Sequence, residues 1–292
     1  MLDRESKLEK KRVSILGCGW LGFPLAQRLQ RDHITLETKG STTSADKLAS
    51  FQDHGIKGYL LDLTPGFSDE ATLLHSFFDS DCLIVSLPPR QSKNEPGFYV
   101  QQIQAVAAEI KKSPIKEVIL ISSTGIYPEL NRIVTEEDVL ASEESAPSDM
   151  VAAENLLQSL RPDITVTILR LGGLMGYNRI PGKYVKGQKN MITGSIPVNY
   201  IHRDDAVGII ISILEQGLVN ETFNIVSPLH PVRRDIYENS CSRFNWEAPT
   251  FAEPDISPDF KVISGEKFDS TYSYNFIFPD PLKFYYSLEN EM

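Results

Sequence analysis

The sequence predicts an α/β fold in which helices cover both faces of a doubly wound parallel sheet, followed by a smaller C-terminal lobe. Two observations indicate the sheet. Short apolar runs alternate with amphipathic helical segments up to residue 171, and a glycine-rich turn joins the first run to the first helix. A third observation indicates the lobe: beyond residue 172 the chain becomes glycine-rich and basic, and later rich in aromatic residues and prolines.

The individual elements follow from the apolar pattern. Residues 13–16 form a short, mostly apolar run, and Leu21, Leu25 and Leu29 recur at helical spacing after the turn. The continuous apolar run at 81–87 is typical of a parallel strand that is covered on both faces. Further strands are expected at 34–40, 58–63, 117–122 and 164–171. Further helices are expected at 45–54, 98–110, 149–160 and 205–215.

Glycines between the first strand and the first helix have the spacing G-x-G-x-x-G. Gly17 permits the tight turn, Gly19 lets the backbone approach a ligand, and Gly22 lets the helix pack closely on the strand. The amino terminus of a helix is also a ready binding site for an anion. In this context the motif predicts a Rossmann domain that binds the pyrophosphate of a nicotinamide dinucleotide, NAD(P).

Other coenzyme contacts are expected where the parallel strands end, because ligands of such sheets bind outside the carboxyl ends of the strands. The turn at 41–44 and the segments that follow residues 87, 122 and 171 all belong to that edge. The predicted coenzyme-binding residues are Gly17, Gly19, Trp20, Leu21, Gly22, Ser41, Thr42, Thr43, Leu87, Pro88, Ser122 and Ser123.

The predicted domain limits follow from these elements. Residues 1–11 are charged and are expected to form a flexible N-terminal segment. Residues 12–172 are expected to form the Rossmann domain, and residues 173–292 mainly a substrate lobe. The segment 200–217 is expected to pack back on the Rossmann domain.

Composition argues against several classes of function. The 292 residues carry a formal net charge of −10, whereas a nucleic-acid groove needs a basic face. No run approaches the ~20 apolar residues of a membrane span, and the charged N-terminus lacks the apolar core of a signal peptide. A cytoplasmic location is therefore expected. The cysteines (Cys18, Cys82 and Cys241) are far apart and indicate neither a disulfide framework nor a metal site.

The choice of coenzyme depends on the end of the second strand. An acidic residue about 20 positions after the first glycine would favour NAD by binding the ribose hydroxyls. Glu37 has this spacing, but the strand is expected to run on to Gly40 and to leave Glu37 short of the loop. The turn at 41–44 offers hydroxyls and no carboxylate, with Lys39 nearby, so the sequence favours NADP over NAD. Asp62, after the third strand, either contacts the adenine or caps the next turn.

Five motifs in a fixed order carry a family resemblance. They are the glycine turn at 17–22, Leu-Pro-Pro at 87–89, Ile-Ser-Ser-Thr-Gly-Ile-Tyr at 121–127, Leu-Arg-Leu-Gly-Gly-Leu-Met-Gly at 169–176 and Tyr-Ile-His-Arg-Asp-Asp at 200–205. With these motifs the chain resembles the extended short-chain dehydrogenase/reductases, which include nucleotide-sugar epimerases and dehydratases. More narrowly, it resembles the atypical YeeZ-type branch of that superfamily, which is described as NAD(P)-binding or epimerase-like.

The resemblance implies that Ser123 occupies the place of the family's catalytic serine or threonine. Active members also use a Tyr-x-x-x-Lys pair, in which the lysine favours ionisation of the tyrosine. Counting back from Glu154 in the matching helix puts the tyrosine position at Ala146 and the lysine position at Met150. Neither side chain can transfer a proton, and none of the 11 tyrosines has a lysine four residues later. The usual relay is therefore absent.

Two residues could replace the missing acid. Tyr127 lies at the strand end, where its phenol could act as the acid or could pack against the loop with its hydroxyl bonded to the backbone. An unperturbed His202 would titrate near neutrality, but its position at the start of a helix also fits a structural residue, with Asp204 or Asp205 as the helix cap.

The sequence thus predicts an NAD(P)-dependent oxidoreductase or epimerase/dehydratase-like enzyme of the extended short-chain type, without the Tyr-x-x-x-Lys relay. Its substrate would be a small polar or nucleotide-linked molecule, with Ser123 bonded to a substrate oxygen and Tyr127 or water supplying the proton. Arg179 and Lys183 either bind an anionic substrate or are solvated loop charges. The alternative is a non-catalytic dinucleotide-binding sensor or scaffold.

Overall fold

The structure is a computed structural model that describes residues 10–89 and 96–289. These residues divide into two compact units that alternate along the chain. The first comprises 10–121, 152–168 and 210–221, and the second 122–151, 169–209 and 222–289. The predicted flexible segment 1–11 lies almost wholly outside the described residues. The predicted domain limits, which divide the chain sequentially at residue 172, stay a prediction.

A seven-stranded sheet has the order β10-β7-β5-β4-β1-β2-β3. Its strands are β1 (Arg12–Leu16), β2 (Glu37–Thr42), β3 (Lys57–Leu60), β4 (Cys82–Val85), β5 (Glu117–Ser123), β7 (Thr165–Leu171) and β10 (Thr222–Ile225). β1 pairs in parallel with β2 and β4, β2 with β3, and β4 with β5. The chain builds outward from β1 to one edge and then crosses to build the other, which confirms the doubly wound sheet that the sequence predicted.

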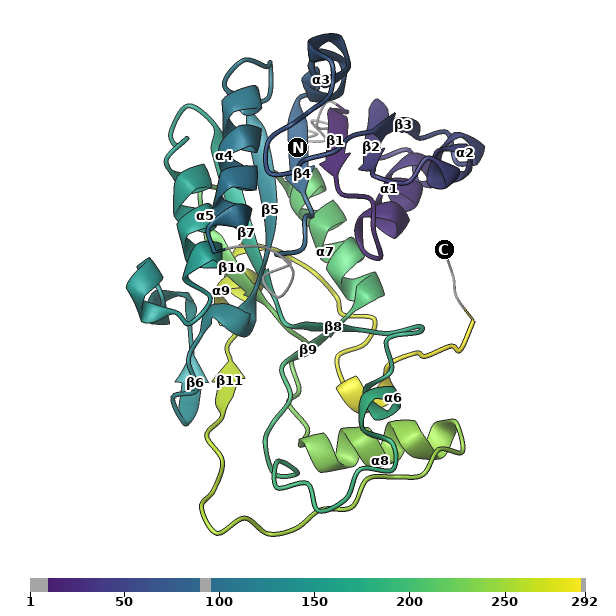
Figure 1. Ribbon diagram of the computed structural model, residues 1–292, viewed down its shortest axis with the longest axis vertical. Coiled ribbons are helices and arrows are strands. Elements are labelled where there is room, and N and C mark those ends of the chain that lie inside the picture. The colour runs from purple at the N-terminus through teal and green to yellow at the C-terminus, as the bar shows by residue number, and fades with distance from the viewer. Residues whose placement is uncertain (1–9, 90–95, 290–292) are drawn as a thin grey trace, which may run out of the picture. The chain divides into compact units, whose positions relative to one another are not determined.

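Helices and short strands complete the fold (Figure 1). The helices are α1 (Gly22–Arg31), α2 (Asp46–Asp53), α3 (Ala71–Phe78), α4 (Phe98–Ile110), α5 (Ser148–Gln158), α6 (Pro181–Val185), α7 (Arg203–Gln216), α8 (Arg233–Arg243) and α9 (Glu266–Thr271). The short strands are β6 (Arg132–Val134), β8 (Gly173–Met175), β9 (Tyr200–His202) and β11 (Lys261–Ile263). In the described part of the chain, no helix has the length and apolar character needed to cross a bilayer.

The core of the first unit lies on its parallel strands. α1 contacts β1 and β2, and α2 contacts β2 and β3. Alternate residues of one strand point to opposite faces of a sheet, and Leu83 and Val85 of β4 share a face. They join Phe77 of α3 and Ile103 of α4 in one buried apolar cluster. This packing fixes the strand ends, where the first candidate site lies.

β2 differs from the prediction in a way that affects the site. It was expected at 34–40, but it spans Glu37–Thr42. Ser41 and Thr42 pair with Tyr59 and Leu60 of β3, so the ladder continues through residues that were expected to form a turn. Backbone pairing to a distant strand sets this boundary, and the polar side chains of the segment gave no sign of it.

The second unit contains two small parallel ladders, β8 with β9 and β6 with β11. The predicted helix at 205–215 is α7, which begins two residues earlier. Asp205 in its first turn is fully buried, and its carboxylate accepts hydrogen bonds from the Tyr274 hydroxyl and from the amides of Ile277 and Phe278. A carboxylate bonded in this way fixes the C-terminal segment to α7.

Candidate functional site

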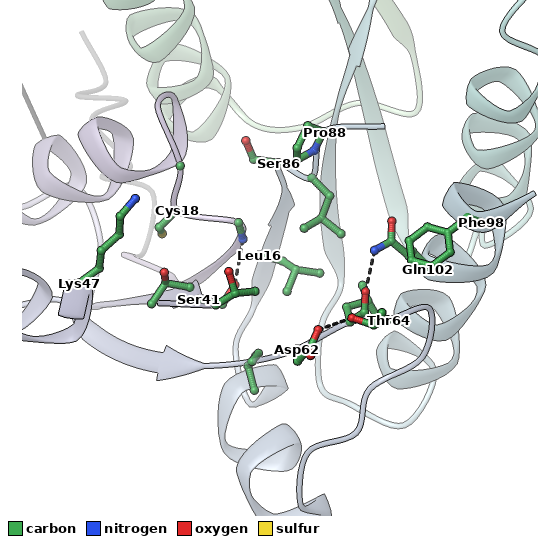
Figure 2. A pocket seen from close by; sticks show the side chains of 17 residues that line it. Leu16, Cys18, Ser41, Lys47, Asp62, Thr64, Ser86, Pro88, Phe98 and Gln102 are labelled. Atoms are coloured by element: carbon green, nitrogen blue, oxygen red, sulfur yellow. Dashed lines mark hydrogen bonds between the residues drawn. The ribbon is translucent and has the colours of Figure 1, made fainter. Parts of the chain in front are cut away.

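The first unit holds a cavity of about 400 Å³ next to the carboxyl ends of its strands (Figure 2). Its walls are Leu16, Gly17, Cys18, Gly19, Ser41, Thr42, Thr43, Lys47, Leu61, Asp62, Leu63, Thr64, Ser86, Leu87, Pro88, Phe98 and Gln102. The predicted coenzyme-binding residues among them are Gly17, Gly19, Ser41, Thr42, Thr43, Leu87 and Pro88. We call this cavity the glycine-turn pocket.

The three glycines of the turn have different surroundings. Gly17 has a φ of +99°, and a Cβ there would lie 2.6 Å from the carbonyl oxygen of Ser86. A Cβ on Gly22 would collide with the carbonyl oxygen of Gly17. Both positions therefore need glycine for the fold itself. A Cβ on Gly19 would meet no protein atom within 4 Å, so the protein's own packing leaves that position open toward the pocket.

Ser41 joins the end of β2 to the glycine turn. Its hydroxyl accepts a hydrogen bond from the Gly17 amide at 2.9 Å, and its carbonyl accepts one from the Cys18 amide at 2.8 Å. The Gly19 amide donates to the Gly17 carbonyl. These amides are thus bonded within the protein, and an anion would meet the first turn of α1. No side chain of the described residues caps that helix end, and its first turn holds no acidic residue.

The charges near β2 differ from the predicted arrangement. Lys39 is only 2 % exposed, and its ammonium donates to the carbonyls of Ser76 and Asp79 at 2.8 and 2.5 Å. The expectation that Lys39 lies near a ribose 2′-phosphate is therefore wrong, because its ammonium is bonded to these carbonyls and lies 3.4 Å from the Glu37 carboxylate. Glu37 begins β2, at the opposite end from the pocket, as the sequence indicated. Lys47 of α2, which the sequence analysis did not single out, lines the pocket instead (Figure 2).

The far wall of the pocket has both apolar and polar groups. Asp62 lines it, accepts a hydrogen bond from the Thr64 hydroxyl, and so also closes the turn after β3 (Figure 2). The Gln102 amide donates to the Leu63 carbonyl at 2.7 Å, which ties α4 to this turn. Both interpretations of Asp62 thus fit its position.

Cys18 fits the interpretation of a small packing residue in the turn. It is 4 % exposed, and burial raises the pKa of its thiol to about 12. Its thiol lies 3.8 Å from the Ile15 carbonyl. A thiol of this kind is almost wholly protonated near neutral pH and is a poor nucleophile.

The other predicted coenzyme residues lie elsewhere. Trp20 and Leu21 lead into α1 and Gly22 begins it, but none of the three is among the residues found to line the glycine-turn pocket. Ser122 is a buried residue of β5, and Ser123 ends that strand in the second unit.

Ser123 lines a cavity of about 440 Å³ in the second unit. Its other walls are Thr124, Gly125, Glu129, Gly173, Ile196, Pro197, Val198, Asn199, Tyr200, Arg233, Tyr237 and Lys261. The Ser123 Oγ accepts a hydrogen bond from the Gly125 amide at 3.0 Å, which leaves its own hydrogen to be donated. We call this cavity the Ser123 pocket.

Tyr127 is not among the residues that line the Ser123 pocket in the described chain. It is 2 % exposed, and its hydroxyl donates to Asn224 Oδ1 at 2.7 Å and accepts from the Arg170 guanidinium at 2.8 Å. Burial raises the pKa of Tyr127 to about 12, although the charge of Arg170 opposes the shift. The structure thus surrounds this hydroxyl with buried protein groups.

The two relay positions hold residues without proton-transfer chemistry. Ala146 is exposed and precedes α5, which begins at Ser148. Met150 is buried in an apolar cluster of the second unit, where its neighbours include Ile126 and Val226. Packing accounts for Met150.

The remaining predicted residues do not gather at the Ser123 pocket. Arg179 is half-buried, and burial lowers the pKa of its guanidinium. Lys183 of α6 is exposed, and neither cation is among the residues lining that pocket. His202 is fully buried, its Nδ1 accepts from the Asp204 amide, and its Nε2 lies 3.2 Å from the Tyr285 carbonyl. Burial lowers the pKa of His202, so it is held as a neutral ring with both nitrogens bonded.

Five ionisable residues of the Ser123 pocket were not predicted. They are Glu129, Tyr200, Arg233, Tyr237 and Lys261. The Lys261 ammonium donates to the Tyr127 carbonyl and lies 3.2 Å from Glu129. Arg233 and Tyr237 come from α8, a polar helix whose sequence has no apolar stripe. The only local signal was their spacing of four residues. No group of acidic, histidine and cysteine side chains suited to a metal ion occurs among the described residues.

Solved structures of known proteins share this fold. The UDP-Glc/GlcNAc 4-epimerase of Campylobacter jejuni superposes with a TM-score of 0.74 at 15% identity, over 93% of this chain and 95% of that one. The UDP-glucuronic acid 4-epimerase of Bacillus cereus, solved with UDP-glucuronic acid and NAD, superposes with a TM-score of 0.72 at 18% identity, over 93% and 96%. This chain therefore has the same fold as these two epimerases.

Sequence similarity shows the family. Protein YeeZ of Escherichia coli strain K12 is 31% identical over 272 residues, which cover 93% of this chain and 98% of YeeZ. No family model matches the sequence. The chain belongs to the YeeZ family.

Proposed function

We propose that this chain is an NAD(P)-dependent oxidoreductase or epimerase/dehydratase-like enzyme that acts on a small polar or nucleotide-linked substrate. The observation that carries the proposal is Gly19. Gly17 and Gly22 are required by contacts within the protein, but no protein atom would oppose a Cβ on Gly19. A glycine at that position in the pocket wall is explained by a ligand that approaches the backbone there.

The residues of the glycine-turn pocket suit a dinucleotide. The uncapped first turn of α1 would hold the pyrophosphate, because the N–H groups and the dipole of a helix end favour anions. Leu61, Leu63 and Phe98 offer an apolar wall for the adenine. The bound coenzyme would supply hydride chemistry. The Bacillus cereus neighbour, with its NAD and its nucleotide-linked sugar, supports both ligand classes.

The coenzyme preference that we propose is NADP. β2 ends at Thr42, and neither Thr42 nor Thr43 carries the carboxylate that would bind the ribose hydroxyls of NAD. Lys47 is exposed on α2 and lines the same pocket, so its ammonium can bind a 2′-phosphate. Lys47 thus takes the role that the sequence analysis gave to Lys39.

Coenzyme binding tests the first part of the proposal. NADPH should bind the wild-type chain, measured by quenching of protein fluorescence and by calorimetry. Gly19→Ala should weaken NADPH binding at least 10-fold, because the added methyl group occupies the position left open for the ligand. The control is Gly66→Ala, another glycine whose Cβ would meet nothing within 4 Å. Wild-type chain that binds neither NADPH nor NADH would contradict the proposal.

Coenzyme preference is tested at Lys47. Lys47→Gln should weaken NADPH binding about 5-fold to 10-fold and leave NADH unchanged, since about 1.4 kcal/mol of charge interaction is a factor of ten. Lys111→Gln, at an exposed lysine after α4, is the matched control. Equal losses for both coenzymes would contradict a 2′-phosphate contact.

We propose the Ser123 pocket as the substrate site. Ser123 would donate its remaining hydrogen to a substrate oxygen, as the family resemblance implies. Ser123→Ala should lower kcat about 100-fold with unchanged affinity for NADPH. Equal kcat values for the two proteins would contradict this role.

The second candidate function is a non-catalytic dinucleotide-binding sensor or scaffold. It is favoured by Ala146 and Met150 at the relay positions, and by the bonded hydroxyl of Tyr127. Tight NADPH binding without turnover of any carbonyl compound or sugar nucleotide would favour the sensor. Turnover that depends on Ser123 would favour the enzyme.

A further inference from the structure

Two consecutive arginines begin α8 and line different cavities. Arg233 lines the Ser123 pocket, whereas Arg234 lines a cavity of about 260 Å³ in the same unit. The Arg233 amide donates to the Ile196 carbonyl at 2.9 Å, and the Arg234 amide donates to the Gly194 carbonyl at 3.0 Å. The backbone of both arginines is thus fixed to the segment 194–196, so the two side chains can be compared directly.

The two guanidinium groups differ in the negative charges around them. The Arg234 guanidinium lies 3.6 Å from the Glu253 carboxylate, and both Glu253 and Asp235 line its cavity. Arg233 is half-buried, and no ion pair or hydrogen bond joins its guanidinium to another residue of the described chain. The protein therefore supplies a counter-charge for Arg234 and none for Arg233.

The place of Arg233 at the start of α8 makes this difference more significant. The amino-terminal end of a helix carries a partial positive charge, so a cation in the first turn is unfavourable. For Arg234 the carboxylate of Glu253 offsets that cost, but Arg233 has no such partner among the described residues. Helix stability does not account for an arginine at this position, whereas a bound anion does.

The other charged groups that line the Ser123 pocket neutralise each other. The Lys261 ammonium lies 3.2 Å from the Glu129 carboxylate and donates to the Tyr127 carbonyl at 2.5 Å. Glu129 is the one acidic residue among those that the structure describes as lining the pocket. The pocket thus keeps the positive charge of Arg233, although the whole chain has a formal net charge of −10.

The polar groups of the pocket suit two different parts of a ligand. The Asn199 carboxamide donates to the Lys261 carbonyl at 3.0 Å and accepts from the Ile263 amide at 2.9 Å, so it holds β11 in place. The Ser123 hydroxyl keeps one hydrogen for a neutral oxygen. The Arg233 guanidinium offers a charged fork of N–H groups, which matches the oxygens of a carboxylate or a phosphate.

We propose that the substrate of the Ser123 pocket is acidic and that Arg233 binds its carboxylate or phosphate group. This inference rests on the function proposed above, and it narrows the substrate to a molecule whose acidic group lies in this pocket. A keto or hydroxy acid fits the description, and so does a phosphate ester with a carbonyl or hydroxyl group. Ser123 donates to the carbonyl or hydroxyl oxygen. Arg233 thus takes the role that the sequence analysis considered for Arg179 and Lys183.

Binding in the absence of coenzyme tests this inference. The probes are two matched pairs, pyruvate with methyl pyruvate and glycerol 3-phosphate with glycerol, in which the second member lacks the negative charge. Nuclear magnetic resonance titration is followed at the backbone amides of Gly125 and Gly173, which line the pocket. At least one acid should bind with a Kd at least 10-fold below that of its neutral partner. The pair with the larger ratio distinguishes a carboxylate from a phosphate.

Variants of the two arginines show which side chain binds the acid. Arg233→Gln should weaken binding of the acid at least 10-fold and leave the neutral partner within twofold. Arg233→Lys keeps the charge but loses the fork, so it should lose less than Arg233→Gln. Arg234→Gln is the matched control and should stay within twofold, and urea denaturation checks that each variant is folded. Equal affinities within both pairs, or wild-type affinity of folded Arg233→Gln for the acid, would overturn the inference.

Turnover provides a second readout and separates this inference from the proposed function. The carbonyl probes are pyruvate, methyl pyruvate, glyceraldehyde 3-phosphate and glyceraldehyde, each with NADPH. Arg233→Gln should raise KM for an acidic probe at least 10-fold, with unchanged affinity for NADPH. Absence of NADPH binding would contradict the proposed function, and the titration would still measure the acids. Normal NADPH binding without any preference for the acids would overturn this inference alone.

Discussion

The two pockets are built from different parts of the polypeptide. The glycine-turn pocket is shaped mainly by the backbone. Gly17 has a left-handed conformation, its amide donates a hydrogen bond to the Ser41 hydroxyl, and the first turn of α1 has no side-chain cap. The Ser123 pocket is framed by side chains that lie far apart in the sequence, from Ser123 to Lys261. The glycine-turn pocket should therefore be sensitive to substitutions that add atoms, and the Ser123 pocket to substitutions that remove side-chain atoms.

A buried polar network adjoins the second pocket through Lys261, which bonds the Tyr127 carbonyl. Arg170 donates to the Tyr127 hydroxyl and to the carbonyls of Glu136 and Val139, at 2.8, 3.1 and 3.0 Å. The Glu136 carboxylate accepts a hydrogen bond from the backbone amide of Asn224 at 2.7 Å. Each of these groups depends on another for its hydrogen bonds, because water does not reach them.

The largest effect is expected from removal of the Arg170 guanidinium. Arg170→Met should lower the free energy of unfolding by about 3–5 kcal/mol, because it leaves the Tyr127 hydroxyl and the carbonyls of Glu136 and Val139 buried without their charged donor. Urea denaturation measures it, with the surface change Arg28→Met of α1 as the control, expected within about 0.5 kcal/mol. A loss below about 1 kcal/mol would show that the second unit does not depend on this network.

An added methyl group in the first pocket should have the next largest effect. Gly17→Ala should cost about 2–3 kcal/mol of unfolding free energy, since its φ of +99° and the Ser86 carbonyl at 2.6 Å both oppose a Cβ. Gly19→Ala is the matched change and should leave stability within about 0.5 kcal/mol. If the two variants unfolded alike, the distinction between a structural and a ligand-facing glycine would fail.

Tyr127→Phe distinguishes the hypothesis that Tyr127 is the catalytic acid from the interpretation that it is a structural residue. Loss of the hydroxyl leaves Asn224 Oδ1 and one Arg170 N–H without that partner, which should cost about 1–2 kcal/mol of unfolding free energy. If Tyr127 is structural, kcat with the carbonyl probes should stay within about threefold of the wild-type value. A fall of 100-fold, with stability unchanged, would instead make Tyr127 the acid.

The contrast between the pockets also explains what the sequence could predict. The glycine turn and the doubly wound sheet follow from local spacing and apolar periodicity, and the structure has them. The extension of β2 through Ser41 and Thr42 did not follow, because pairing with β3 decides it.

A local sequence pattern also could not predict which groups individual side chains contact. Lys39 was expected at the coenzyme, but it reaches the carbonyls of Ser76 and Asp79. Arg233 and Tyr237 were missed because a polar helix gives no sign of what it faces. Sequence spacing can predict a site that is formed by backbone groups. A site formed by side chains that lie far apart in the sequence can be recognised only when the tertiary fold is known.

The smallest effect is a pH dependence in the second unit, on the strand that carries Tyr200. Burial lowers the pKa of His202 below the ordinary value of about 6.5 that the unfolded chain would show. As the pH falls through that value, the unfolded state takes up a proton that the folded state resists, so stability decreases. His202→Gln should therefore flatten the slope of unfolding free energy between about pH 7.5 and 5.5, measured by urea denaturation at each pH. His75→Gln, at an exposed histidine of α3, should leave the wild-type slope in place. An identical slope in His202→Gln would mean that the buried ring is protonated in the folded state as readily as in the unfolded one.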